Sequence, residues 1–263
     1  NQMLGGRALA GEVEYGEQVR IDSTVVETNI HDPSDSSLLS DGIRILTRMM
    51  VSAKKKLKVP GVDFIDHRKS AKSLARQVFY TRGIVKKKPL YRDLLSHAEQ
   101  VMKYSSDTLW HVQLYRFRGP AYGQWIDDMR HYRRLLRRVI RQARRRVLNG
   151  ESVPAIEKVV SLYEAHTDII VKGSRDVQYG HKLNLITGKE GLVLDATIES
   201  GNPCDTERYL PMLQRQEAIY GQLPDSVAAD GGYASTANLN EAKALGVCEV
   251  AFQKKKELTV EAM

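Results

Sequence analysis

The stretch Val19-Arg-Ile-Asp-Ser-Thr-Val-Val26 predicts a β-strand whose more polar side carries Asp22. A second strand-like run, Val227-Ala-Ala-Asp-Gly-Gly-Tyr233, delivers Asp230 to the end of a strand, and its two glycines let a ligand approach the backbone closely. Two carboxylates that converge from separate strands form an oxygen site suited to Mg²⁺ or Mn²⁺. Asp22 and Asp230 are therefore the candidate catalytic residues and the candidate metal ligands.

The composition narrows the classes of function. The chain has 263 residues, 42% of them hydrophobic, which allows one large domain or one domain with an insertion. Its net charge of +8 favours a polyanion such as nucleic acid or an acidic membrane surface. No apolar run approaches the roughly 18 residues of a membrane span, and the first residues lack a hydrophobic signal core, so we expect a cytoplasmic protein that does not enter a membrane. Cys204 and Cys248 are isolated and are expected to be reduced thiols.

The second half of the chain predicts alternating strands and helices. His181–Thr187 and Gly191–Ile198 are expected to form an antiparallel hairpin. The further expected elements are, in order, a helix capped by Asp205, the strand that ends in Asp230, a helix capped by Ser235 and a strand over 248–252.

A long helical region separates the first strand from this hairpin. Apolar residues recur there at helical spacing, for example Leu39, Ile43, Leu46 and Met50, and a later helix is expected to begin after Pro89. Breaks at Lys58–Gly61 and Arg118–Pro120 predict a bundle of helices. We therefore divide the chain into a first core part, 1–35, a helical insertion, 36–150, and the remainder of the core, 151–263.

The strongest charge signal lies between His131 and Leu148, where the chain has many arginines and no acidic residue. An apolar stripe at helical spacing leaves these arginines on the flanks and the outer face of a helix. Arginine forks pair well with phosphates, so the helix is a candidate contact with the DNA backbone, although a solvated charged face is the alternative. The candidate DNA-binding residues are Arg134, Arg137, Arg138, Arg141, Arg144, Arg145 and, on a later strand, Lys182, which could equally be a solvated strand lysine.

The expected order of elements resembles the ribonuclease H-like fold of polynucleotidyl transferases. In that fold an antiparallel three-strand unit precedes alternating helices and strands, and the first and fourth strands are neighbours. The resemblance implies that Asp22 and Asp230 lie close together. The predicted fold class is α/β, a ribonuclease H-like mixed sheet with a long helical insertion between the first and second core strands.

Local motifs in matching order are similar to those of the DDE transposases of bacterial insertion sequences. These motifs are Ile21–His31, Asp35–Leu39 with Asp41-Gly42, Tyr179-Gly-His-Lys182, Gly201-Asn-Pro-Cys-Asp205 and Ala229-Asp-Gly-Gly-Tyr233. The resemblance implies that Asp22 and Asp230 are the first two acids of a catalytic triad that binds two divalent ions. It also implies DNA as the substrate, with cleavage at element ends followed by strand transfer, and is consistent with a homodimer at the bacterial nucleoid.

The third acid of the triad is expected on a helix beyond the last strand. Glu257 and Glu261 follow that strand too closely to be assigned this role, so we expect the sequence to be truncated at both ends and inactive on its own. Two other functions stay open: a DNA-binding remnant without catalysis, and another ribonuclease H-like nuclease. Structural roles also stay open for Asp22, which could pair with Arg20, for Asp230 as a turn residue, and for Asp195, for which structural pairing is expected.

Overall fold

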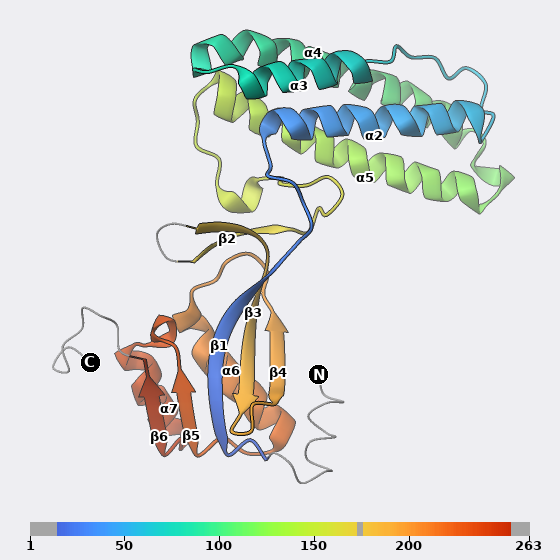
Figure 1. The fold of residues 1–263 in the computed structure, drawn as a ribbon. Helices are drawn as coiled ribbons and strands as arrows, with labels where there is room; N and C mark the ends of the chain where they lie inside the picture. Colours follow the sequence, from blue (N-terminus) through green and yellow to red (C-terminus); the bar gives the residue numbers. More distant parts are fainter. Residues whose placement is uncertain (1–14, 173–175, 254–263) are drawn as a thin grey trace. The chain divides into compact units, whose positions relative to one another are not determined.

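The computed structural model describes residues 15–172 and 176–253 and divides the chain into two units (Figure 1). The sheet unit joins Asn1–Thr28 to Asp168–Met263, and the helical unit is Asn29–Thr167. The sequence-based boundaries, after residues 35 and 150, differ from these. The segment after residue 150 belongs to the helical unit because Val159 and Leu162 are buried in its core.

The sheet unit contains a mixed six-stranded sheet, and the chain is therefore an α/β protein as predicted. The strands are β1 (Gln18–Glu27), β2 (Asp168–Lys172), β3 (Asp176–Gly188), β4 (Val193–Ile198), β5 (Ser226–Ala229) and β6 (Glu249–Phe252). Their order is β2-β3-β1-β5-β6, and β4 also pairs with β3. β3 is antiparallel to β1, β2 and β4, whereas β5 is parallel to β1 and β6 is parallel to β5. The predicted hairpin, formed by β3 and β4, is confirmed.

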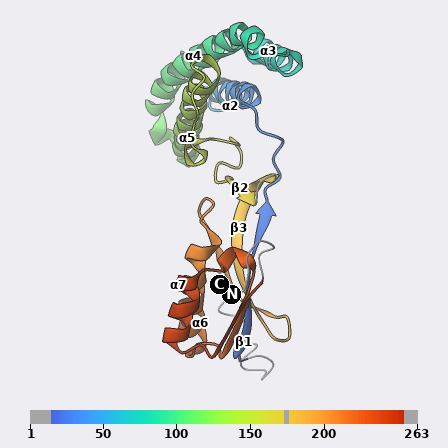
Figure 2. The ribbon, with the colours of Figure 1, turned by 90° about the vertical axis from the view of Figure 1, so that its left-hand side faces the viewer.

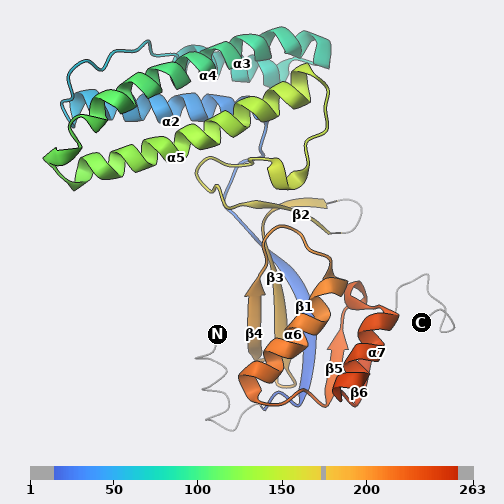
Figure 3. The same ribbon diagram turned by 180° about the vertical axis from the view of Figure 1, so that it is seen from behind.

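Helices α6 (Asp205–Tyr220) and α7 (Thr236–Leu245) cover one face of the sheet (Figures 2 and 3). Alternate residues of the strands, such as Val19 and Ile21 on β1 and Val227 on β5, are buried with them. Figure 1 looks onto the opposite face of the sheet, where the described elements place no helix. Strand alternation therefore decides which side chains enter the core and which stay on this open face.

One of the two predicted helix caps is confirmed. The Ser235 hydroxyl accepts a hydrogen bond from the Asn238 N–H at 3.0 Å and caps α7. The prediction that Asp205 caps α6 is wrong: Cys204 is the N-cap residue and makes no side-chain cap bond. The Asp205 carboxylate instead pairs with Lys182.

The helical unit consists of long helices that pack side by side (Figures 1 and 3). They are α2 (Asp35–Lys55), α3 (Arg68–Tyr80), α4 (Ile84–Gln113) and α5 (Pro120–Ala143), and a π-helical turn, Arg144–Leu148, continues α5. The predicted breaks before α3 and before α5 are confirmed. The predicted helix start after Pro89 is wrong, because α4 begins at Ile84 after a break at Gly83 that the prediction missed. Pro89 forfeits only one backbone bond, near the start of the helix.

Two expectations drawn from composition can be compared with the structure. Cys204 and Cys248 are exposed free thiols, as predicted. In residues 15–172 and 176–253, every helix is too short or too polar to cross a membrane.

Candidate functional site

Asp22 and Asp230 follow the same residue pair in the sheet. In the parallel ladder of β1 and β5, the last registered pair is Ile21 opposite Ala229, so the next residue on each strand is one of the two aspartates. The backbone of Asp230 is still extended, with φ −64° and ψ 156°. Neighbouring strands lie about 4.8 Å apart. The structure therefore brings the two predicted site residues side by side, where β5 ends beside the middle of β1.

Both aspartates also belong to the open face of the sheet. Ile21 and Ala229 are buried under the helices, and side chains alternate between the two faces along a strand. Opposite Asp22 in the antiparallel ladder stands Leu185, whereas the buried Asn184 stands opposite Ser23. The carboxylates therefore lie on the face that the described helices of the sheet unit leave uncovered.

The contacts of the two carboxylates are local and leave oxygens accessible. Asp22 Oδ1 accepts a hydrogen bond from the Ser23 N–H at 2.7 Å, and Oδ2 lies 3.3 Å from Arg20 Nη2. The Asp22 side chain is 45% exposed, and an ion pair this exposed contributes little to stability. Asp230 is exposed, and its Oδ1 accepts a hydrogen bond from the Gly231 N–H at 2.6 Å. Both side chains keep exposed surface, and the pairing of Asp22 with Arg20 that the sequence left open is present.

Tyr233 is a site residue that the sequence analysis missed. Its ring is fully buried, and its hydroxyl donates a hydrogen bond to Asn184 Oδ1 at 2.6 Å. Burial raises the pKa of the Tyr233 phenol, and the negative charges of Asp205, Asp22 and Asp230 raise it further. The phenol is thus a neutral, buried group close enough to both aspartates for their charges to act on it. Its position three residues after Asp230 was the only signal in the sequence.

A buried polar network extends from Tyr233 to α6. Asn184 Nδ2 donates to Glu199 Oε1 at 2.7 Å, and Arg208 pairs with both oxygens of Glu199 at 2.9 and 2.8 Å. Asn184 is completely buried and Glu199 nearly so. A network whose members are satisfied in this way fixes side chains in one arrangement. It therefore holds Tyr233, and with it the loop after Asp230, against the sheet.

Lys182 lies beside this network in a buried ion pair. The side chain was predicted to contact DNA or to be solvated, but the residue is only 4% exposed. Its Nζ lies 2.6 Å from Asp205 Oδ1 and donates to the Pro203 carbonyl oxygen, also at 2.6 Å. A Cβ on Gly232 would stand 2.7 Å from Asp205 Oδ2, so the loop after Asp230 packs directly on this pair. The structure gives Lys182 a supporting position instead of an exposed one.

The expected structural pairing of Asp195 is confirmed. The carboxylate is almost fully buried and accepts hydrogen bonds from Arg215 Nε and Nη2 at 2.7 and 2.9 Å. The hydrogen bond with Asp195 raises the pKa of the Arg215 guanidinium. Asp195 is therefore occupied on the helix-covered face and does not join Asp22.

In the described part of the chain, the candidate metal ligands are two carboxylates. Asp22 and Asp230 have the oxygen donors that Mg²⁺ and Mn²⁺ prefer. Residues 15–172 and 176–253 contain no group of three or more His, Cys, Asp or Glu side chains that could hold a metal ion. Glu257 and Glu261 lie outside the described residues.

Two of the predicted DNA-binding arginines have acidic partners elsewhere in the chain, and a third bonds a backbone carbonyl. Arg144 pairs with Glu99 on α4, and Arg145 pairs with Glu151 and Glu157 at 2.9 and 2.6 Å. Arg138 Nη2 donates to the Glu157 carbonyl oxygen at 3.2 Å. The absence of acidic residues near the arginines in the sequence suggested an unpaired basic helix, but acidic residues from other segments pair with some of these arginines.

The other predicted arginines, Arg134, Arg137 and Arg141, are exposed on α5. In the described ranges, none of the three has an ion pair or a side-chain hydrogen bond. These three side chains are therefore free to contact a phosphate, and they remain candidate DNA contacts.

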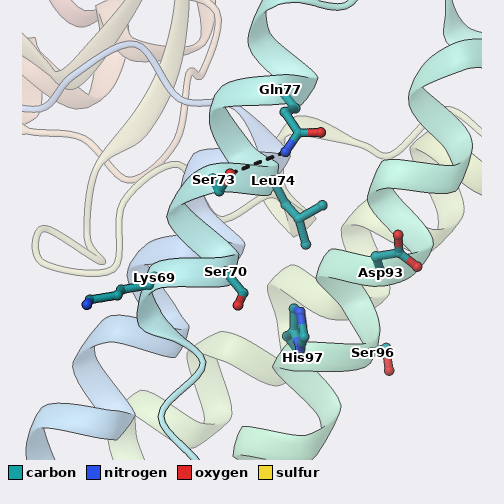
Figure 4. A pocket seen from close by; sticks show the side chains of 8 residues that line it. All are labelled: Lys69, Ser70, Ser73, Leu74, Gln77, Asp93, Ser96 and His97. Atoms are coloured by element: carbon teal, nitrogen blue, oxygen red, sulfur yellow. Dashed lines mark hydrogen bonds between the residues drawn. The ribbon is translucent and has the colours of Figure 1, made fainter.

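A separate hollow lies between α3 and α4 in the helical unit (Figure 4). Its wall combines Lys69, Ser70, Ser73, Leu74 and Gln77 from α3 with Asp93, Ser96 and His97 from α4. The rings of His67 and His97 are 4.6 Å apart, and buried ring nitrogens of both lack a hydrogen-bond partner among the described residues. Burial lowers the pKa of His67, and the neighbouring His97 lowers it further. His67 therefore packs as a neutral ring against His97.

The chain matches no protein-family model, no curated protein and no solved structure. The sequence motifs and the geometry around Asp22 and Asp230 therefore carry the functional argument.

Proposed function

We propose that the sheet unit is a ribonuclease H-like core. The support comes from strand order: β1, β3 and β4 form an antiparallel unit, and α6, β5, α7 and β6 follow in alternation. The first and fourth strands of this set, β1 and β5, are parallel neighbours, as the resemblance implies. The helical unit interrupts the chain after β1, and β2 is an addition that pairs only with the first part of β3.

On this core we propose the function of a DNA transposase, namely metal-dependent DNA strand cleavage and strand transfer. The observation that carries the proposal is the consecutive register of Asp22 and Asp230 on neighbouring parallel strands. The two carboxylates would hold Mg²⁺ or Mn²⁺, which supplies charge neutralisation at a phosphate and activates a hydroxyl or water nucleophile. Both lie on the open face of the sheet, which can accept a duplex.

The chain's own residues would keep this arrangement rigid. Asp230 stands where β5 passes into the loop, and Tyr233, Asn184 and the Lys182–Asp205 pair fix that loop from below. Preorganised groups lose little freedom when substrate binds, which is why supporting contacts matter for catalysis. The exposed Arg134, Arg137 and Arg141 would contact DNA phosphates through their guanidinium forks.

Strand cleavage by the full-length protein tests this function. A supercoiled plasmid with Mg²⁺ or Mn²⁺ reports nicking, and Asp22→Asn and Asp230→Asn should each reduce the rate by at least about a hundredfold, since each removes a charged ligand from the reacting centre. DNA affinity should stay within about twofold. Asp225→Asn is the matched control, because this exposed aspartate lies at the other end of β5. Cleavage that survives either site substitution would remove the assignment.

A further inference from the structure

The turn between α3 and α4 exposes large apolar side chains. Phe79 and Tyr80 end α3 and are 75% and 74% exposed, and Val85 in the first turn of α4 is 77% exposed. The two aromatic rings meet edge to face, with centroids 5.2 Å apart. Single exposed apolar residues are ordinary, but a cluster of adjacent ones indicates a binding surface.

The same segment is strongly basic. Between Asp66 and Asp93 the chain contains no acidic residue, whereas lysines and arginines recur throughout. Arg68 pairs with Asp66, and Lys88 Nζ donates to the Leu148 carbonyl oxygen. In the described part of the chain the remaining basic side chains have no ion pair: Lys69, Lys72, Arg76, Arg82, Lys86, Lys87 and Arg92. The positive charge of this segment is thus neutralised by fewer acidic side chains than the positive charge of the arginine-rich helix α5.

The turn between α3 and α4 lies next to the C-terminal end of α5. The bond from Lys88 to Leu148 brings the first turns of α4 against the π-helical end of α5, and Figure 1 shows both at the same end of the helical unit. Phosphates bound along α5 and phosphates bound at the turn could belong to one polyanion.

We propose that the turn over residues 76–88, here called the aromatic turn, binds unpaired DNA. Exposed aromatic rings stack on bases, and this requires bases that are free of a partner strand. The surrounding lysines and arginines bind the backbone of the same strand. The net charge of the segment complements a polyanion. This surface goes beyond the aspartate site, because it would bind DNA whether or not Asp22 and Asp230 support cleavage.

Fluorescence anisotropy with a labelled single-stranded oligonucleotide and with the duplex of the same sequence tests the proposal. Phe79→Ala/Tyr80→Ala should weaken single-strand binding by about tenfold or more, since stacking is lost, and should change duplex binding by less than about threefold. Trp110→Ala is the matched control, because Trp110 is an exposed aromatic residue on α4 outside the turn, and it should leave both affinities unchanged.

A second pair of variants separates charge from stacking. Arg82→Ala/Lys86→Ala should lower the salt dependence of single-strand binding, by about 0.7 in the slope of log K against log salt for each lost phosphate contact. All these side chains are exposed, so the variants should fold, and circular dichroism checks that they do.

The outcomes distinguish the alternatives. Unchanged single-strand affinity in Phe79→Ala/Tyr80→Ala, or an equal loss for duplex, would overturn the proposal. So would loss of binding to phosphatidylglycerol vesicles in variants that bind DNA normally, because the turn would then be a membrane contact. Plasmid cleavage depends on Asp22 and Asp230, so failure of the aromatic turn and failure of the proposed enzyme are separate results.

Discussion

Asp22 and Asp230 each follow a residue of the last registered pair between β1 and β5, Ile21 opposite Ala229. More than 200 positions separate the two aspartates in the sequence, and the parallel pairing of the strands brings them side by side. The same alternation that buries Ile21 and Ala229 under α6 and α7 places both carboxylates on the open face.

Tyr233→Phe should destabilise the protein. The hydroxyl donates to the buried Asn184, so its removal leaves an acceptor in the polar network unsatisfied. The free energy of unfolding should fall by about 1–3 kcal/mol in urea denaturation. Tyr209→Phe is the matched control, because the buried Tyr209 hydroxyl has no hydrogen-bond partner among the described residues, and its removal should be neutral or stabilising. Equal effects of the two substitutions would refute the role of the network.

Stability should fall at alkaline pH through Tyr209. Burial raises the pKa of Tyr209 to about 12, whereas an unfolded tyrosine ionises near pH about 10. The neutral phenol therefore contributes stability that is fully present below about pH 10 and is lost as the pH rises toward 12. Unfolding free energies measured at pH 9 and 11.5 should differ less in Tyr209→Phe than in the wild type. An unchanged difference would contradict the assignment.

Acid should weaken the helical unit through His67. Burial lowers the pKa of His67 in the folded protein, and His97 lowers it further, while Asp66 acts in the opposite direction. The neutral imidazole thus contributes stability that is present above the ordinary pKa of about 6.5 and is lost as the pH falls below it. His67→Phe keeps an aromatic ring beside His97 and Tyr104 and should reduce the loss between pH 7.5 and 5.5. A wild-type loss that the substitution leaves unchanged would assign the acid sensitivity to other groups.

Lys182→Met should reduce stability without reducing DNA affinity. The substitution leaves the Asp205 carboxylate without its ammonium partner in a largely buried position, which should lower the free energy of unfolding by about 2–4 kcal/mol. Lys182→Met/Asp205→Asn removes both charges and should restore part of that loss. A variant that folds normally but binds DNA weakly would instead support the predicted DNA contact.

The sequence predicted five of the six described strands because strand alternation and helix spacing are local signals, but it missed β2 and the first residues of β3. The β3–β4 hairpin, α6, β5 and α7 occur where Gly221, Ser235 and similar boundary residues predicted them. The cap at Asp205 was predicted wrongly because its tertiary partner, Lys182, competes for the carboxylate. The local sequence does not predict a partner that lies far away along the chain.

In the helical unit, too, tertiary contacts decide features that the local sequence does not predict. The arginines of α5 have no acidic neighbour in sequence, yet Glu99, Glu151 and Glu157 reach Arg144 and Arg145 from other segments. Conversely, the exposed Phe79 and Tyr80 lie in an amphipathic helix whose sequence does not distinguish buried from exposed aromatic rings. Tyr233 was missed because its burial depends on the path of the loop that follows β5.

Iron-mediated backbone cleavage tests the central claim, that Asp22 and Asp230 hold one ion together, most directly. Fe²⁺ replaces Mg²⁺ at carboxylate sites, and ascorbate with peroxide then cuts the chain next to the bound ion. Cuts are expected near both residue 22 and residue 230 of the full-length protein, and excess Mg²⁺ should suppress them. Asp22→Asn or Asp230→Asn alone should abolish both cuts, and Asp225→Asn should abolish neither. Cutting at only one of the two strands, or persistence of both cuts in either site variant, would contradict a shared site.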